Sequence, residues 1–231
     1  MGTVIPLKKE VQDSYFELKN YFSKEIEMVN AKIRHKLSSE VKLVRKLTGH
    51  HFSSEGKKIR ALLTLGSAKL CLNAINERSI NLAACVELIH NATLLHDDVL
   101  DNGKIRRGIK TTNRIWGNHS SILVGDYLLS RCFEMMVEDG SLEILKLLST
   151  TSSKIAQGEV LQLEHKGEID ILEETYFDII NSKTAALFAA ATRVGACITN
   201  KNKKEKDALE SYGRNLGLAF QIADDTLDYY S

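Results

Sequence analysis

Along most of this chain, apolar residues recur at steps of three and four, which is the spacing of one face of an α-helix. The longest such stripe starts at Val11 and ends at Leu37, so one amphipathic helix is expected there. A short helix is expected to end near Leu47, before a turn at 49–51. Further helices are expected over residues 56–72, 76–102, 118–138, 142–165, 171–181, 184–199 and 203–230.

Polar and glycine positions mark the expected helix ends. Gly140 and Ser141 form a typical stop followed by a typical start, and Asp170 with Glu173 three residues later is a second start signal. Segment 104–110 is basic and is expected to be a loop. No segment shows the alternation of apolar and polar residues that is typical of a half-buried strand. The pattern therefore predicts an all-α fold.

The composition supports this fold class. The 231 residues include a single proline, at position 6, whereas a β-sandwich or barrel of this length would need many turns rich in proline and glycine. Hydrophobic residues make up 43% and charged residues 26%, as in ordinary globular domains. Because no linker divides the sequence, we expect one domain over residues 1–231.

Charge and cysteine content narrow the function classes. There are 31 Lys and Arg against 30 Asp and Glu, so no basic excess supports a nucleic-acid partner. No apolar run approaches the roughly 18 residues of a membrane-spanning helix. The four cysteines form no Cys-x-x-Cys pair, so they are expected to be reduced and buried, in a cytoplasmic protein.

Two acidic clusters with one pattern, two aspartates and a third after two more residues, interrupt apolar helical stretches. The clusters are Asp97, Asp98 and Asp101, and Asp224, Asp225 and Asp228. The first and last aspartate of each are four apart and so share a helix face. Such carboxylates repel one another unless cations lie between them, and oxygen ligands suit Mg²⁺. A single cluster of this kind would be explained by solvated surface charge, but two copies of the same pattern favour a metal site. An EF-hand does not fit the first cluster, because no closing glutamate is present.

Basic residues flank the first cluster. Lys57 and Arg60 lie one turn apart at an expected helix start, where backbone N–H groups also favour anions. His90 is seven residues before Asp97 and shares its face, although a lone histidine is more often structural. Arg106-Arg107 follows the cluster, and guanidinium groups match phosphate oxygens. Together with Mg²⁺, these residues favour a diphosphate substrate.

With these motifs assembled, the sequence resembles the all-trans polyprenyl diphosphate synthase family over nearly its whole length. The strings that carry the resemblance are EGKKIRALL, ELIHNATLLHDDVLDNGKIRRG, IAQGEVLQL, KTAALF and FQIADDTLDY. The likeness is greatest to long-chain, octaprenyl-like members, which supply quinone side chains. It implies an antiparallel helical bundle of the isoprenoid synthase type, a homodimer, and two substrates, isopentenyl diphosphate and an allylic diphosphate.

The resemblance also implies roles for individual residues. Mg²⁺ at the allylic diphosphate would be held by Asp97 and Asp101, with Asp98, and further Mg²⁺ by Asp224 and Asp228, with Asp225 nearby. Isopentenyl diphosphate would be bound by Lys57, Arg60, His90 and Arg107. The allylic substrate would be contacted by Arg106, Lys183, Thr184 and Gln221. The residues expected to carry the catalytic step are Asp97, Asp98, Asp101, Lys183 and Asp224.

In the family, the positions just before the first cluster line the tunnel of the growing chain. Here they are Ala92 and Thr93, both small, so products longer than fifteen carbons are expected. Phe133, in the following helix, is the candidate for the tunnel floor, and ordinary core packing is the alternative.

Two departures from the family pattern bear on activity. Glu55 replaces a glycine and Ala61 replaces a proline in the family's GGKxxRP segment. The chain also stops at Ser231, three residues after the second cluster, where family members continue with a lysine-containing loop and further helices. A C-terminally incomplete synthase domain is therefore expected.

Three other functions compete with chain elongation. A terpene cyclase also ionises a diphosphate but usually lacks a basic site for a second substrate. A non-catalytic or poorly active synthase subunit is kept open by the missing C-terminal segment, although such subunits typically lose the aspartate clusters. A generic helical interaction module would leave the two clusters as solvated faces.

Overall fold

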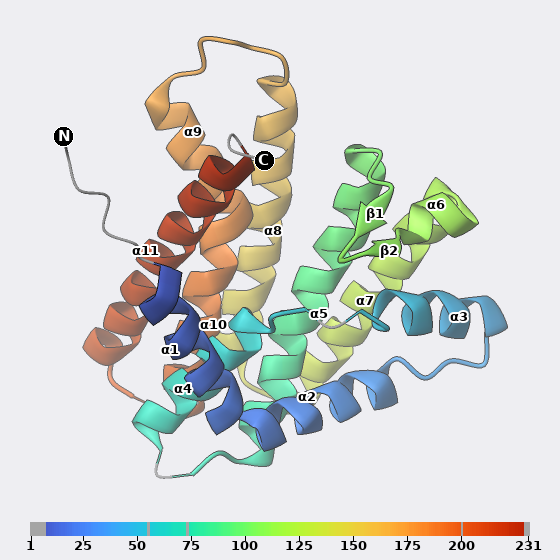
Figure 1. The fold of residues 1–231 in the computed structure, drawn as a ribbon. Helices are drawn as coiled ribbons and strands as arrows, with labels where there is room; N and C mark the ends of the chain where they lie inside the picture. The colour runs from blue at the N-terminus through green and yellow to red at the C-terminus, as the bar shows by residue number, and fades with distance from the viewer. Residues whose placement is uncertain (1–7, 55, 73, 200, 229–231) are drawn as a thin grey trace.

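A computed structural model describes residues 8–54, 56–72, 74–199 and 201–228, with side chains described from Ser14 to Leu227 (Figure 1). The fold is all-α, as predicted. Its helices are α1 Lys8–Tyr21, α2 Ser23–Lys36, α3 Lys42–His51, α4 Ile59–Cys71, α5 Glu77–Leu100, α6 Thr112–Trp116, α7 Asn118–Asp139, α8 Leu142–Glu164, α9 Glu173–Ile180, the π-helical turn η1 Asn181–Ala185, α10 Ala186–Ile198 and α11 Lys203–Asp228.

Helix α5 forms the centre of the bundle. Every residue from Leu82 to Ile89 is buried, which is typical of a helix that is surrounded by others. Helices α7, α4 and α2 pack around α5, while α10 packs against α4, α8 and α11. The C-terminal ends of α5, α8 and α11 lie at the same end of the bundle (Figure 1). The first aspartate cluster is at the C-terminal end of α5 and the second at the C-terminal end of α11, so the fold brings both clusters to the same end of the bundle.

The N-terminal stripe differs from the single helix expected over 11–37. It forms α1 and α2, with Phe22 between them at φ −101° and ψ 18°. Backbone hydrogen bonds still run from Phe22 to Leu18 and from Ile26 to Phe22, so the break is a local bend. The phenyl ring of Phe22 is buried, whereas Tyr21 beside it is exposed. The bend thus turns the stripe onto the core.

Two further local expectations are wrong, and tertiary contacts explain both. The turn expected at 49–51 is the end of α3, where His51 is buried and its Nε2 lies 3.0 Å from Oδ1 of Asn91 on α5. The basic loop contains a two-stranded antiparallel hairpin, β1 Ile105–Arg106 and β2 Ile109–Lys110. Strands of two residues are too short to show a periodicity that a sequence pattern can detect.

The helix-end signals have mixed outcomes. Gly140 adopts φ +73° and ends α7, and the Ser141 hydroxyl accepts a hydrogen bond from the backbone N–H of Ile144, as expected of a cap. The start signal at Asp170 is wrong, because Leu172 precedes α9 and provides no side-chain cap. Packing of the apolar end of α9, rather than a cap, fixes this helix, since Ile180 is buried.

Two findings bear on the cysteine and membrane expectations. The four cysteines are free thiols, and three of them are buried. Over the described ranges, no helix combines the length and the apolar character needed to cross a bilayer. The cytoplasmic location stays a prediction.

Candidate active site

The first aspartate cluster occupies the end of α5, and its three carboxylates have different surroundings. Asp97 is half-buried, Asp98 is buried and Asp101, just past the helix, is exposed. The pKa of Asp97 is raised to about 7, chiefly because burial disfavours its charged form and also because Glu159 lies near it. Asp98 accepts a hydrogen bond of 2.8 Å from Nε of Arg106. Asp97 and Asp101 therefore remain for a cation, while Asp98 is held by an ion pair.

The second cluster lies near the end of α11 and is supported by neutral groups. Asp225 accepts two hydrogen bonds, one of 2.6 Å from the Tyr176 hydroxyl and one of 2.8 Å from Nε2 of Gln221. The hydroxyl of Thr184 in turn donates to Oε1 of Gln221 at 2.7 Å. Asp224 is exposed on the same helix, and the side chain of Asp228 lies outside the described residues. This chain of hydrogen bonds fixes Gln221 and Asp225 relative to η1.

One cavity joins the two clusters. It has a volume of about 500 Å³, and Asp101 of the first cluster and Asp225 of the second both line it. Lys183, Thr184 and Gln221 line it as well, so three of the four residues expected to contact the allylic substrate meet here. The prediction that two distant acidic segments share one site gains its geometric basis from this cavity.

Lys183 enters this cavity from the π-helical turn η1. Its ammonium group donates to Oε2 of Glu159 and to Oε1 of Gln162 on α8, both at 2.9 Å. An ammonium group has three donors, so one remains for a ligand. π-Helical turns are rare and occur frequently at functional sites. Here the turn carries Lys183 and Thr184 on consecutive positions at the end of α9.

A basic group lies further down α5 and at the start of α4. Nη1 of Arg60 is 3.2 Å from Nε2 of His90, and the Arg60 guanidinium also stacks over the Phe188 ring at 4.6 Å. Burial and the nearby cation Arg60 hold the pKa of His90 well below its usual range. His90 is therefore neutral, and its Nε2 accepts the hydrogen bond from Arg60. Burial lowers the pKa of Arg60 itself to about 10, which leaves it charged at neutral pH.

The hairpin places the two arginines on different partners. Arg106 pairs with Asp98, whereas Arg107 lies at the turn with φ +50° and packs against Gly56. A Cβ atom added to Gly56 would be 2.6 Å from the Arg107 guanidinium, so a larger residue here would shift that group. Lys57 is exposed beside this contact, and its carbonyl accepts from the Tyr15 hydroxyl at 3.0 Å.

The site contains three residues to which the sequence analysis gave no role. Glu87 is buried on α5, 3.4 Å from Nζ of Lys58, and accepts from the Ala61 N–H at 3.1 Å. Glu159 is the partner of Lys183, and Tyr176 that of Asp225. A signal existed for the two glutamates, because each is a lone carboxylate in an apolar helical stretch. Tyr176 gave no comparable signal.

The Ala61 departure from the family pattern has a structural counterpart. Proline has no backbone N–H, so a proline here could not make the bond to Glu87. Glu55, the other departure, lies outside the described residues.

The chain-length candidates fall into two groups. Ala92 is fully buried and Thr93 is half-buried on α5, one helical turn before Asp97. Phe133 instead lies on the outer side of α7 with 44% of its surface exposed, while Leu128, Cys132 and Met136 form the buried side. The helical phase of α7 turns the Phe133 ring outward, so the alternative of core packing within the chain is wrong, and the role of Phe133 as tunnel floor stays a prediction.

Carboxylate positions bear on the expected metal. Within the part of the chain that the structure describes, no three His, Cys, Asp or Glu side chains are close enough to form a complete ion site. Mg²⁺ does not require one, since it usually takes one or two carboxylates and completes its shell with water and substrate phosphates. Asp101 and Asp225, which line one cavity, fit that mode of binding.

A comparison of the sequence with models of known protein families identifies its family. Residues 41–231 match the family model described as Polyprenyl synthetase. The chain belongs to the polyprenyl synthetase family. This agrees with the resemblance that the sequence motifs indicated, and the helical bundle is the fold expected for that family.

Similar proteins of this family include long-chain and short-chain synthases. The chain is 48% identical over 150 residues to octaprenyl diphosphate synthase of Escherichia coli, which covers 65% of this chain and 46% of that protein. It is 43% identical over 153 residues to a short chain isoprenyl diphosphate synthase of Methanothermobacter thermautotrophicus, covering 64% and 47%. The chain thus spans about half the length of the curated relatives it matches.

A solved polyprenyl synthase of Caulobacter crescentus, in complex with calcium and isoprenyl diphosphate, superposes with a TM-score of 0.90. The two sequences are 43% identical, and the superposition covers 94% of this chain and 66% of the other. The fold described above is therefore that of a polyprenyl synthase.

Proposed function

We propose that this protein is a prenyltransferase that condenses an allylic diphosphate with isopentenyl diphosphate to give a long-chain all-trans polyprenyl diphosphate. The observation that carries the proposal is the single cavity that Asp101, Asp225 and Lys183 line together. Carboxylates on two walls with an ammonium group between them suit a diphosphate that is bound through cations. Membership of the polyprenyl synthetase family supports the same reaction class.

We infer that the cation is Mg²⁺, held by Asp97 and Asp101 on one wall and by Asp224 and Asp228 on the other, with Asp225 adjacent. The raised pKa of Asp97 supports this role, because a nearby cation would offset the burial and repulsion that cause it. When bound, the metal would stabilise the negative charge of the departing diphosphate. A relative whose structure holds calcium together with an isoprenyl diphosphate supports divalent-cation binding in this fold.

The protein's own groups would orient the allylic substrate. Lys183 has one donor left after Glu159 and Gln162, and that donor can reach a diphosphate oxygen in the cavity. The Nε atom of Arg106 is used by Asp98, while its Nη groups form no hydrogen bond to a residue that the structure describes. Thr184 and Gln221 present oxygen dipoles near the reacting carbons without acting as nucleophiles. The apolar residues Ile179 and Ile180 help to exclude water from the cation.

Isopentenyl diphosphate would be bound by Lys57, Arg60, His90 and Arg107. Neutral His90 accepts from Arg60 and so directs the guanidinium, rather than adding a charge of its own. Buried Glu87 balances part of the positive charge, as its attraction to both Arg60 and Arg107 shows. A terpene cyclase would not need this second basic group, so the group favours condensation over cyclisation.

Three finer points complete the proposal. Small side chains at Ala92 and Thr93 leave room for a product longer than fifteen carbons, of the kind used for quinone side chains. A homodimer is supported by α7, whose outer side exposes 67% of Leu123, 44% of Phe133 and 66% of Val137. Exposed apolar side chains along one helix are typical of a helix–helix interface.

The proposal predicts a loss of more than 100-fold in the rate of isopentenyl diphosphate incorporation for Asp97→Asn and for Asp224→Asn. The reason is that each change removes a charged ligand of the cation that stabilises the leaving group. The measurement is transfer of labelled isopentenyl diphosphate into an extractable product with geranyl diphosphate and Mg²⁺. Asp170→Asn, in the exposed loop before α9, is the matched control and should stay within twofold of the parent.

Three outcomes would contradict the proposal. If Asp97→Asn or Asp224→Asn keeps the parent's turnover, that aspartate is not a ligand of an essential cation. A parent chain that folds but incorporates no isopentenyl diphosphate would instead favour the non-catalytic subunit, and consumption of geranyl diphosphate alone would favour a cyclase.

A further inference from the structure

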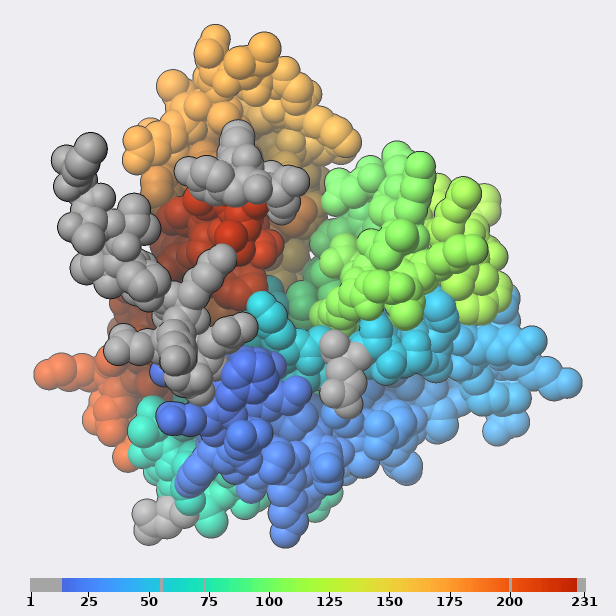
Figure 2. Space-filling view, in the orientation of Figure 1, coloured from blue at the N-terminus to red at the C-terminus, as the bar shows by residue number. Residues whose placement is uncertain are grey.

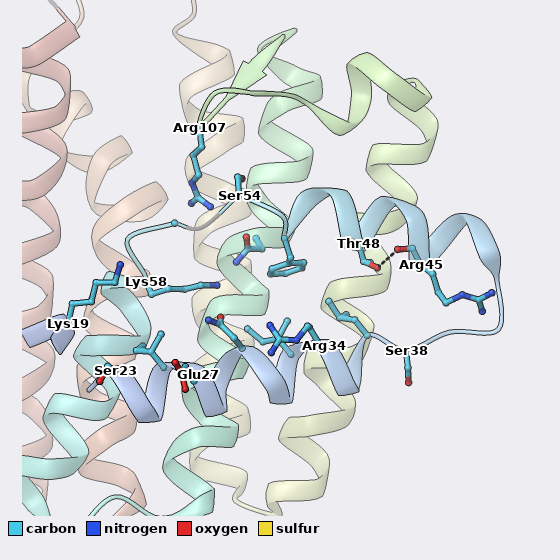
Figure 3. Close-up of a pocket in the computed structure, with 18 of the residues that line it drawn as sticks. Lys19, Ser23, Glu27, Arg34, Ser38, Arg45, Thr48, Ser54, Lys58 and Arg107 are labelled. Atoms are coloured by element: carbon cyan, nitrogen blue, oxygen red, sulfur yellow. Dashed lines mark hydrogen bonds between the residues drawn. The ribbon is translucent and has the colours of Figure 1, made fainter. Parts of the chain in front are cut away.

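A second cavity, of about 570 Å³, lies between α2, α3 and the segment before α4, away from the aspartate clusters (Figure 3). Five cationic side chains line it, and Glu27 is the single carboxylate among the described residues that line it. The five are Lys19, Arg34, Arg45, Lys58 and Arg107. Of the residues proposed to bind isopentenyl diphosphate, only Arg107 lines this cavity, so the cavity adjoins that proposed site and shares Arg107 with it.

Three of these five cations have no hydrogen-bond or ion-pair partner among the residues that the structure describes. Lys19, Arg34 and Arg107 form no hydrogen bond or ion pair with any residue in the described ranges. Lys58 is 3.4 Å from Glu87, which must also balance Arg60 and Arg107. In Figure 3 the Lys58 side chain extends into the space above α2, and Arg107 points down toward the same space from the hairpin. Unbalanced cations around a concave space attract an anion.

The backbone before α4 explains why Lys58 faces this cavity while Lys57 does not line it. Lys58 adopts a left-handed conformation with φ +53°, which is unusual for a residue other than glycine. Lys58 also lies 5.5 Å from the Phe52 ring, a cation–π contact on the cavity wall. Such local strain is tolerated where the surroundings fix it, and here Glu87 and Phe52 do so.

The remaining wall is apolar. Ile26 and Ile33 on α2, Leu37 just after it and Phe52 after α3 line the cavity beneath the cations. Ile26, Ile33 and Leu37 are buried, with 7%, 1% and 5% of their surface exposed. A volume of several hundred Å³ with apolar walls and a few charged groups is typical of a small-molecule site.

We propose that this cavity binds an amphiphilic anion, a phosphate or carboxylate that carries a short alkyl or prenyl chain. Its head group would lie among Arg34, Lys58 and Arg107, and its chain along Ile26 and Ile33. The site is additional to the proposed reaction, and its occupant need not be a substrate.

Octyl phosphate is a suitable probe, with inorganic phosphate for comparison, both titrated calorimetrically into the full chain in EDTA without Mg²⁺. Octyl phosphate should bind at least tenfold more tightly than inorganic phosphate, because only the former uses the apolar wall. The double variant K19Q/R34Q should weaken octyl phosphate binding at least tenfold. R45Q is the matched control and should stay within twofold, since Arg45 donates to the Ser39 carbonyl and points away from the centre (Figure 3).

Three results would overturn the proposal: no binding of octyl phosphate at millimolar concentration, equal binding by parent and K19Q/R34Q, or binding that K183Q abolishes and K19Q/R34Q does not. The third result would place the probe in the aspartate-lined cavity. Circular dichroism of each variant verifies folding. Because the readout is binding without Mg²⁺, it is independent of whether the chain elongates a prenyl diphosphate.

Discussion

The two aspartate clusters have the same sequence pattern but different support. In the first, the middle carboxylate, Asp98, is buried and forms an ion pair with Arg106. In the second, the middle carboxylate, Asp225, is held by the neutral donors of Tyr176 and Gln221. An ion pair cancels the charge of the carboxylate, whereas neutral donors orient it and leave its charge in place. The second cluster therefore presents more negative charge for its size.

This difference follows from how deeply each aspartate cluster is buried. On α5, Asp97 is half-buried and Asp98 is buried, and Asp98 is neutralised by Arg106. On α11, Asp224 is exposed to solvent. Figure 2 shows the ends of α5 and α11 as separate surfaces at the same end of the molecule. The sequence motif thus determines which carboxylates are present, while their burial determines how the charge of each is neutralised.

The largest expected effect tests the burial of the first cluster. Asp97 has a pKa raised from 3.8 to about 7, so between these values the folded chain binds more protons than the unfolded chain. The free energy of unfolding therefore falls as the pH rises through this window. Asparagine does not titrate, so Asp97→Asn loses this pH dependence. The free energy of unfolding of Asp97→Asn minus that of the parent should therefore rise by on the order of 3–4 kcal/mol from pH 4 to pH 7.

Urea unfolding in EDTA at a series of pH values measures this difference. Asp97→Ala serves as the control, because neither replacement titrates and both must show the same pH dependence. A difference between Asp97→Asn and the parent that stays constant from pH 4 to pH 7 would show that Asp97 is not destabilised by burial.

An intermediate effect tests the ion pair. Asp98→Ala should lower the free energy of unfolding by about 2 kcal/mol, because Asp98 is buried and accepts a charge-assisted hydrogen bond. Arg106 keeps contact with water, which limits the cost of losing its partner. Urea unfolding at neutral pH measures the change. A double-mutant cycle with Arg106→Gln isolates the pair, and a coupling energy near zero would show that the two charges act independently.

Much of the fold followed from the sequence. Apolar spacing predicted the helices α5, α7, α8 and α11 to within a few residues, because long amphipathic or buried helices have a strong period. The bend at Phe22, the short hairpin and the end of α3 did not follow, since contacts such as His51 to Asn91 decide them.

For the candidate site, residue types were easier to predict than partners. The motifs predicted that the two aspartate clusters and Lys183 belong to one site, and Asp101, Asp225 and Lys183 line one cavity. The π-helical turn at Lys183 and the pairing of Asp98 with Arg106 depend on packing between distant segments. The outward position of Phe133 did not follow either, because a residue type alone does not give the phase of the helix that carries it.

The smallest expected effect concerns the neutral donors of the second cluster. Tyr176→Phe removes one hydrogen bond to Asp225 and leaves the one from Gln221 in place. A net loss of about 1 kcal/mol in the free energy of unfolding is expected, half of that for Asp98→Ala, because water can replace a neutral donor at a partly exposed carboxylate. Urea unfolding of both variants under one set of conditions makes the comparison. Equal losses would mean that ion pairing gives the first cluster no advantage over hydrogen bonding, and that burial alone separates the two walls.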